Sequence, residues 1–256
     1  MRLIREIARW GALTVEQICG LRDPELLFHS RATAYGRLKA LARAGYLEFQ
    51  RPFFRSPRQP FIPSREFWTG WVPFPGPGVY VVTWTGMRQI GQRPLPPTKI
   101  TTLRRLRALR THLFVVDLAT WLMQQHPGTV WLTHREMLRE AMAQVRQRSG
   151  CLLDGAGHVP EGLLSFPSTK RVAVELDLSP RPRRVYERIV AVHINEPRAD
   201  QVHWYASDTD ETLDIVERVV RDRNAGDRIR VIPPPQDLGE HSPWWSSWFR
   251  NRAASR

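Results

Sequence analysis

The sequence has few cysteines and no long apolar run, and these two absences exclude several classes of protein. Only two cysteines, Cys19 and Cys151, occur in 256 residues, and their spacing excludes a cysteine-based zinc site. Isolated thiols are typical of free buried cysteines in a reducing compartment, so we expect a cytoplasmic protein. No apolar run reaches about 18 residues, and the first residues lack the apolar core of a signal peptide, so we expect no membrane association.

Positive charge is concentrated in the first part of the chain. The net charge is +13, and residues 1–110 hold 19 basic and 6 acidic side chains, whereas residues 111–256 hold 19 of each. A basic segment interleaved with core-type apolar residues is typical of a module that binds a polyanion, here joined to a charge-balanced domain. The length is sufficient for two medium domains. We therefore predict double-stranded DNA as the partner.

Residues 1–95 have the pattern of a winged helix-turn-helix domain. A short helix ends at Gly11, a capping box at Thr14–Gln17 opens a second helix, and a third helix is predicted from about Ser30 to Ala44, before a strand. In that fold the third helix enters the major groove. The alternative is a solvated basic face on a structural three-helix unit. The predicted DNA contacts of this helix are Arg31, Thr33, Tyr35, Arg37, Lys39 and Arg43.

A long insertion, rich in proline and aromatic residues, interrupts this domain. Residues 50–98 hold 10 of the 21 prolines, which makes a helix implausible in the insertion between the two strands. The segment 78–84 is predicted as a return strand that pairs with residues 46–50, before a short helix at 85–90. Within the insertion Arg51 and Arg55 alternate with aromatic rings. That pattern is typical either of DNA contact or of a loop that packs onto the domain.

Residues 100–235 are predicted to form an α/β domain. Alternating strand and helix patterns imply right-handed crossovers and a mixed or parallel sheet. His112 is more typical of a hydrogen-bonded core histidine than of a ligand. An aromatic and basic tail, residues 236–256, either folds back or binds a protein partner. The predicted helices are 101–126, 133 onward, 183–194 and 208–223, and the predicted strands are 130–132, a hairpin within 158–178, 202–206 and 228–232.

Acidic residues gather in that hairpin. Because side chains alternate along a strand, Glu175 and Asp177 share one face of the segment 171–178, and Glu161 reaches them from the neighbouring strand. Hard cations prefer oxygen ligands, so Glu161, Glu175 and Asp177 are candidate ligands of Mg²⁺ and candidate catalytic residues. Arg181 is a candidate for stabilising developing charge. The alternative is an open strand face on which the acids are solvated or ion-paired to the arginines at 181–184.

Four segments together resemble the bacterial replication-relaxation family. They are Thr111–Asp117, Trp131–Glu136, the triplet Pro160-Glu161-Gly162, and Val174–Arg181. The resemblance implies a winged helix-turn-helix followed by a restriction-endonuclease-like domain of the PD-(D/E)xK type. It also implies an origin on a plasmid or another mobile element. Glu136, in the second of these segments, is a further candidate acid of the site, although a helix cap explains it as well.

The sequence departs from this pattern at the catalytic positions. Glu161 stands where Asp is usual, and Arg181 stands where Lys is expected. Arginine stays protonated at any working pH and cannot act as a base. We therefore predict a DNA-binding protein of a mobile element that acts in replication, relaxation or conjugative transfer, with a degenerate nuclease-like domain. The alternatives are an active Mg²⁺-dependent endonuclease that nicks DNA, and a winged-helix transcriptional regulator.

Overall fold

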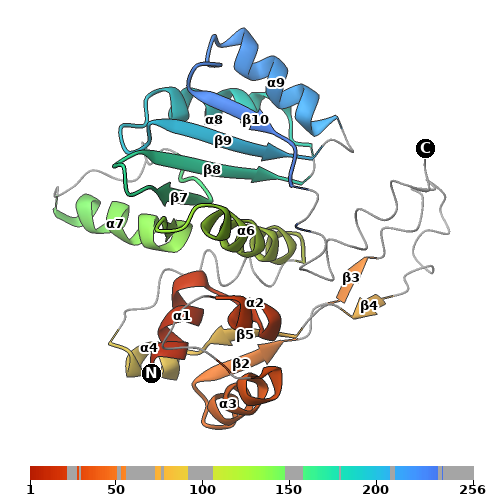
Figure 1. Cartoon of the computed structure of the whole chain (residues 1–256), viewed down its shortest axis with the longest axis vertical. Helices are drawn as coiled ribbons and strands as arrows, with labels where there is room; N and C mark the ends of the chain where they lie inside the picture. Colours follow the sequence, from red (N-terminus) through yellow and green to blue (C-terminus); the bar gives the residue numbers. More distant parts are fainter. Residues whose placement is uncertain are drawn as a thin grey trace. The chain divides into compact units, whose positions relative to one another are not determined.

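The chain contains both α and β structure and divides into two compact units (Figure 1). The computed structural model describes residues 1–21, 28, 30–50, 53–55, 73–75, 78–91, 106–147, 158–178, 180–207, 211–235 and 238. One unit comprises Met1–Asp117 with Gln236–Arg256, and the other comprises Leu118–Pro235. The division lies inside helix α6 (Leu106–Gln125), later than the predicted boundary at residues 95–100. Among the described helices, none is long and apolar enough to cross a membrane.

The first unit combines short helices with an antiparallel sheet. In that sheet β5 lies between β1 and β2 and pairs with both, which confirms the predicted pairing of residues 46–50 with the return strand. The first half of α6 also belongs here, because Leu109 and Leu113 share a small core with Ala12, Val79 and Val81. The elements are α1 (Arg2–Trp10), β1 (Leu13–Thr14), α2 (Val15–Gly20), α3 (Arg31–Arg43), β2 (Leu47–Gln50), β5 (Val79–Val82) and α4 (Trp84–Gln89).

Local sequence explains where the first helices begin and end. Gly11 has a φ of 100°, a conformation that favours glycine, and it ends α1. Thr14 and Gln17 form the predicted capping box, in which each backbone N–H donates to the other side chain at 3.1 Å. The Ser30 hydroxyl accepts a hydrogen bond from the backbone N–H of Thr33 and begins α3. The predicted boundaries of these helices are therefore confirmed to within a residue or two.

The proline-rich insertion contains two short strands that the sequence did not predict. β3 (Phe53–Arg55) pairs antiparallel with β4 (Pro73–Pro75). Arg51, the side chain of Arg55 and nearly all of the tail at 236–256 lie outside the described residues. Their predicted contacts with DNA or with a protein partner stay predictions.

The second unit is built on a five-stranded mixed sheet with the strand order β10-β9-β8-β7-β6. The pairs β6–β7 and β7–β8 are antiparallel, whereas β8–β9 and β9–β10 are parallel, as expected for strands joined by helical crossovers. The elements are β6 (Val130–Thr133), α7 (His134–Gln147), β7 (Gly162–Ser165), β8 (Arg171–Asp177), α8 (Arg183–Ile194), β9 (Gln201–Ala206), α9 (Thr212–Asp222) and β10 (Ile229–Ile232).

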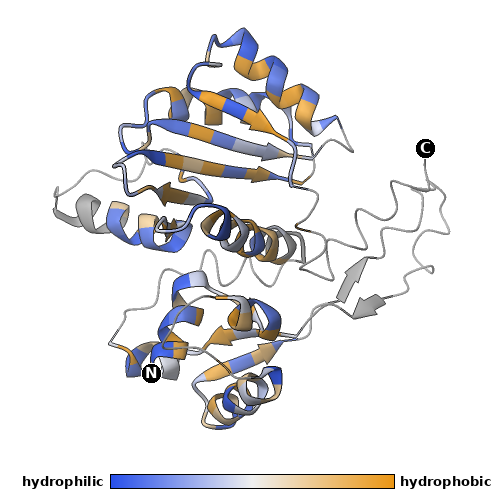
Figure 2. Cartoon of the chain, in the orientation of Figure 1, coloured by the Kyte–Doolittle hydropathy of each residue, from blue (hydrophilic) through white to orange (hydrophobic). Residues whose placement is uncertain are grey.

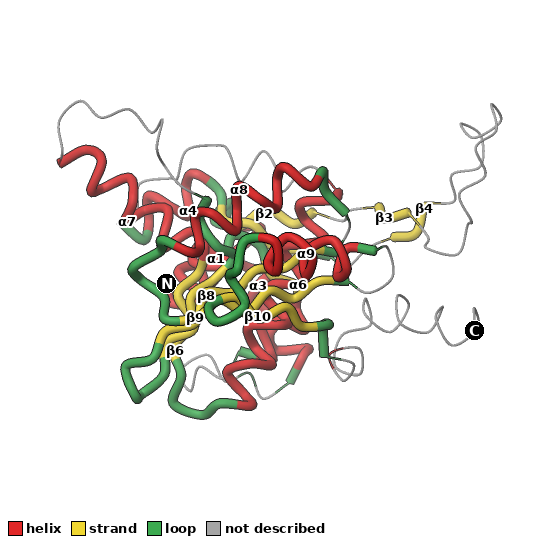
Figure 3. Tube along the Cα trace, turned by 90° about the horizontal axis from the view of Figure 1, so that it is seen from above, coloured by secondary structure: helices red, strands yellow, loops and turns green. Residues whose placement is uncertain are grey.

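The main core of this unit lies between the sheet and the helices α8 and α9, which pack against each other (Figure 3). Apolar and polar residues alternate around α9, and its apolar side is buried (Figure 2). On the sheet, Ala173 and Trp204 face this core. Because side chains alternate, Glu175 and Asp177 point the same way as Ala173, and each is only 3% exposed. The acids therefore face the core under α8, so the open strand face with solvated acids, which the alternative interpretation proposed, is wrong.

Gly162, the first residue of β7, has no room for a side chain. A Cβ atom there would lie 1.9 Å from Cζ2 of the buried Trp131 ring. We expect Gly162→Ala to lower the free energy of unfolding by about 2 kcal/mol, because the overpacked ring must move. Urea unfolding measures the loss. Gly226→Ala is the matched control, since nothing lies within 4 Å of its Cβ position. Equal stability of the two variants would contradict the close contact.

A half-buried histidine on the opposite face of the sheet confers sensitivity to acid. Burial, together with the positive groups Arg230, Lys170 and His126, lowers the pKa of His203 to about 4. In the unfolded chain the pKa is about 6.5, so the folded state loses stability as the pH falls from about 6.5 towards 4. We expect His203→Gln to abolish about 1 kcal/mol of this loss of stability. The effect is no larger because the ring is partly exposed to solvent, which screens its interactions. The free energy of unfolding is measured at about pH 7 and about pH 4.5 for the wild type and for His203→Gln. An identical fall in stability between the two pH values in both proteins would contradict the prediction.

Candidate functional site

Charged side chains converge where the hairpin β7–β8 meets α8. Glu175 and Asp177 lie on β8, and the antiparallel register, with Gly162 opposite Val174, brings Glu161 beside them. Glu161 interacts electrostatically with Asp177 and with His158. Arg181 follows β8 and forms an ion pair with Asp177. The structure thus brings together the four predicted site residues, and it adds histidines that were not predicted.

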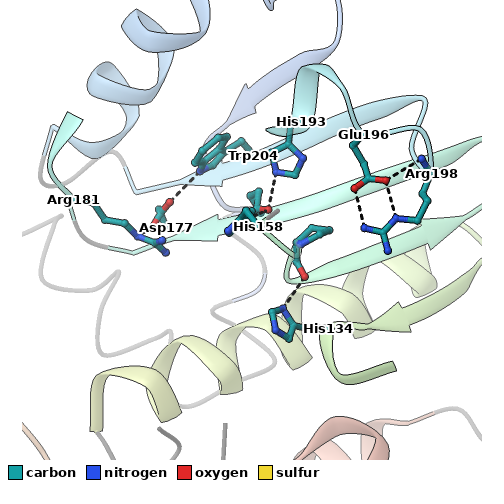
Figure 4. A network of polar contacts seen from close by, with 10 residues as sticks. His134, His158, Asp177, Arg181, His193, Glu196, Arg198 and Trp204 are labelled. Atoms are coloured by element: carbon teal, nitrogen blue, oxygen red, sulfur yellow. Dashed lines mark hydrogen bonds and ion pairs between the residues drawn. The ribbon is translucent and has the colours of Figure 1, made fainter. Parts of the chain in front are cut away.

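Two histidines hold Glu175 (Figure 4). Its Oε1 accepts a hydrogen bond from Nε2 of His158 at 2.7 Å and another from Nε2 of His193 at 2.8 Å. The His193 side chain, on α8, is 0% exposed, whereas that of His158 is 24% exposed. Burial raises the pKa of Glu175, but the two histidines outweigh this effect and leave it at about 2. Burial lowers the pKa of His158, but the charge and hydrogen bond of Glu175, together with the charge of Glu161, outweigh this effect and leave the pKa raised.

Both oxygens of Asp177 also have partners. Nε of Arg181 lies 2.6 Å from Oδ1, and the indole N–H of Trp204 donates to Oδ2 at 3.2 Å. The backbone N–H of Arg181 donates to the hydroxyl of the buried Tyr186, which fixes the loop after β8. Burial raises the pKa of Asp177 to about 6, because Arg181 offsets only part of the desolvation and the charge of Glu175 adds to it. Arg181 therefore neutralises Asp177, as the ion-pair alternative expected.

The carboxylates, bonded in this way, do not fit a Mg²⁺ site. Mg²⁺ requires oxygen ligands in near-octahedral geometry and keeps several waters. Here Oε1 of Glu175 accepts two imidazole N–H bonds, and Asp177 is bonded to Arg181 and Trp204. Among the described residues, the side chains that converge in the manner of metal ligands are His158, Glu175 and His193. Their ligand atoms all lie within 4.8 Å of one another.

Two other residues considered as ligands have local roles. Oε2 of Glu136 accepts hydrogen bonds from the backbone N–H and the hydroxyl of Thr133, both at 2.8 Å, so Glu136 completes the predicted cap of α7. Nε2 of His112 donates to the carbonyl of Ala12 at 2.9 Å. His112 is therefore the hydrogen-bonded core histidine that the sequence indicated.

A second candidate site is the exposed face of α3. Ala34 and Leu38 are buried, and Tyr35 is 50% exposed. Arg31 forms an ion pair with Glu16 of α2, and the guanidinium of Arg37 lies 5.4 Å from the centre of the Phe28 ring. All the residues predicted to contact DNA from this helix are exposed, namely Arg31, Thr33, Tyr35, Arg37, Lys39 and Arg43.

His158, His193 and Trp204 are the site residues that sequence reasoning missed. His193 follows Tyr186 and Ile189 along one stripe of α8, and all three are buried. That helical periodicity was the available signal, because it directs a histidine toward the core beside two strand acids. No protein family, curated protein or solved structure matches this chain. The fold and the site define a mixed α and β protein with a buried histidine–carboxylate cluster.

Proposed function

We propose that this chain is a DNA-binding protein whose first unit is a winged helix-turn-helix. The exposed face of α3 is the observation that carries the proposal. Apart from the inserted strands β3 and β4, the elements run in the order α1-β1-α2-α3-β2-β5, and this order with an antiparallel three-stranded sheet supports a winged helix. In that arrangement α3 is the helix that enters the major groove. The excess of basic residues in the first 110 positions supports the same function.

The side chains on α3 suit both parts of DNA recognition. Arg37, Lys39 and Arg43 are exposed cations within two helical turns, which suits contact with successive phosphates. Thr33 and Tyr35 lie nearer the start of the helix, where base edges are read in this class of domain. Arg31 contributes less to DNA binding in this proposal, because Glu16 already neutralises it.

The second unit, in this proposal, is a nuclease-like domain that has lost Mg²⁺-dependent cleavage. Its hairpin carries Glu161, Glu175 and Asp177 as the resemblance to restriction-endonuclease-like domains implies. His158 and His193 donate hydrogen bonds to Glu175. Arg181, which cannot act as a base, forms an ion pair with Asp177. The domain then serves as a scaffold in replication, relaxation or conjugative transfer of a mobile element.

A metal-dependent endonuclease is the second candidate function, because the three acids and Arg181 lie together. An assay on supercoiled plasmid and labelled duplex, with and without Mg²⁺ or Mn²⁺, separates the two functions. We expect retarded but intact DNA, in equal amount for the wild type and for Glu175→Gln, which removes the negative charge but keeps an acceptor for the two histidines. Nicks that require the metal and disappear in Glu175→Gln would favour the endonuclease. Failure to retard any duplex at low salt would overturn the proposal of DNA binding.

A further inference from the structure

We propose that His158, Glu175 and His193 bind one divalent transition-metal ion of the zinc class. The proposal goes beyond DNA binding and does not depend on it. Nε2 of each histidine lies within 2.8 Å of the same oxygen of Glu175, so three potential donor atoms already face one point. Imidazole nitrogens suit zinc, cobalt, nickel and copper, whereas magnesium and calcium prefer oxygen. The donor set therefore selects a metal class different from the one the acids alone predicted.

The three ligands are held by separate and well-supported elements. Glu175 lies in the central strand of the sheet, and its side chain is 4% exposed. His193 lies in the last turn of α8, where its backbone carbonyl accepts a hydrogen bond from Nε of Arg228 at 2.7 Å. The segment after His158 is fixed where Nδ1 of His134 donates to the carbonyl of Pro160 at 2.9 Å (Figure 4). Such support limits the reorganisation that an ion requires.

Binding requires a small opening of the cluster. Ligand atoms around a tetrahedral zinc lie about 3.3 Å apart, given bonds of about 2.0 Å. The present separations from Oε1 of Glu175 are 2.7 Å and 2.8 Å, so each histidine nitrogen moves away from that oxygen by about half an ångström. His158 is the partly exposed ligand and has the freedom to make this movement. Each neutral ring then carries its proton on Nδ1 and presents the Nε2 lone pair to the ion.

Charge and access agree with a site of this kind. The carboxylate of Glu175 supplies one negative charge, and Glu161 lies close enough to His158 to interact electrostatically. Three protein ligands leave a fourth position open, and His158, with a side chain that is 24% exposed, is the ligand that reaches solvent. A water or an anionic oxygen completes the coordination there. The Nδ1 atom of His193 is buried without a hydrogen-bond partner, so the affinity is lower by about 10-fold to 100-fold than in a fully supported site.

Cobalt spectroscopy on the untagged, chelator-stripped full chain tests the proposal without DNA. We expect one equivalent of Co²⁺ to give the visible absorption of a tetrahedral site, Zn²⁺ to displace it, and excess Mg²⁺ to leave it unchanged. Isothermal titration with Zn²⁺ measures the affinity. His158→Gln should lower that affinity by at least about 100-fold, because it removes one of the three ligands. His158 is partly exposed, so we expect the variant to fold. His203→Gln is the matched control, because His203 is a half-buried histidine on the neighbouring strand β9. This variant should bind Zn²⁺ as the wild type does.

Three results would overturn the metal site. They are the absence of Co²⁺ absorption and Zn²⁺ heat, an unchanged affinity in His158→Gln, and displacement of Co²⁺ by Mg²⁺. Thermal unfolding adds a second readout, because Zn²⁺ at about 100 times the dissociation constant of the wild type raises the stability of the wild type much more than that of His158→Gln. A negative result here leaves the gel-retardation result intact, so failure of the metal site and failure of DNA binding are distinguishable.

Discussion

Reversal of the charges of Arg37 and Lys39 to glutamate is expected to weaken binding to duplex DNA by about 100-fold or more at low salt. Both side chains are exposed on α3, where the proposed docking brings them to the phosphates. Each phosphate that a protein neutralises releases condensed counterions, so the slope of log K against log salt is negative, and the loss of two contacts lowers its magnitude by about 2. Fluorescence anisotropy over a range of salt concentrations measures the affinity and the slope together.

A matched variant separates a local contact from a change in net charge. Arg218→Glu with Arg221→Glu changes the net charge of the chain by the same amount, on exposed positions of α9 in the second unit. We expect this variant to keep nearly all of the affinity and the full salt slope. If both double variants weaken binding equally, α3 is not the helix that contacts DNA. An unchanged slope in the α3 variant would lead to the same conclusion.

Replacement of Glu175 by leucine is expected to lower the free energy of unfolding by about 3 to 5 kcal/mol, measured in urea with a chelator present. The fully buried His193 then loses the acceptor of its Nε2 proton, and its Nδ1 has no partner to begin with. A buried polar group left without its partner incurs the full desolvation penalty, and removal of one member of a buried charged pair is among the most destabilising changes. His158 loses a partner as well, but it is partly exposed to water.

Two control variants show whether the lost acceptor causes the effect. Glu175→Gln keeps a carbonyl oxygen for the histidines, so it should cost clearly less than the leucine variant. Glu217→Leu makes the same change on an exposed position of α9 and should alter stability by no more than about 0.5 kcal/mol. Equal losses in Glu175→Leu and Glu175→Gln would assign the effect to the negative charge and not to the hydrogen bonds.

Features with local causes were predictable from the sequence. The capping box of Thr14 and Gln17 needs only residues three apart, and the β7–β8 hairpin joins neighbouring segments. The alternation that places Glu175 and Asp177 on one face of β8 is likewise a property of any strand. For these reasons the helices of the first unit and the convergence of the acids followed from pattern alone.

The surroundings of the acids depend on distant segments and did not follow from pattern. The parallel register sets Glu175 opposite Trp204, across a connection that includes all of α8. Helix α8, in that crossover, covers the acids and places His193 beside Glu175. The strand face that the alternative interpretation left open is therefore buried. The division inside α6 has a similar cause, because Leu109 and Leu113 find their core partners in Ala12, Val79 and Val81. Neither pairing leaves a local signal.

The mixed sheet also sets an order for the folding reaction. β7 and β8 are joined by a short turn, whereas β6, β9 and β10 pair with their neighbours only across connections that contain a helix. Because loop closure delays contacts between distant segments, we expect the β7–β8 hairpin to form early and α8 to dock late. Glu175 therefore meets His158 within the early hairpin and His193 only at the end. Completion of this cluster coincides with the last step that makes the second unit compact.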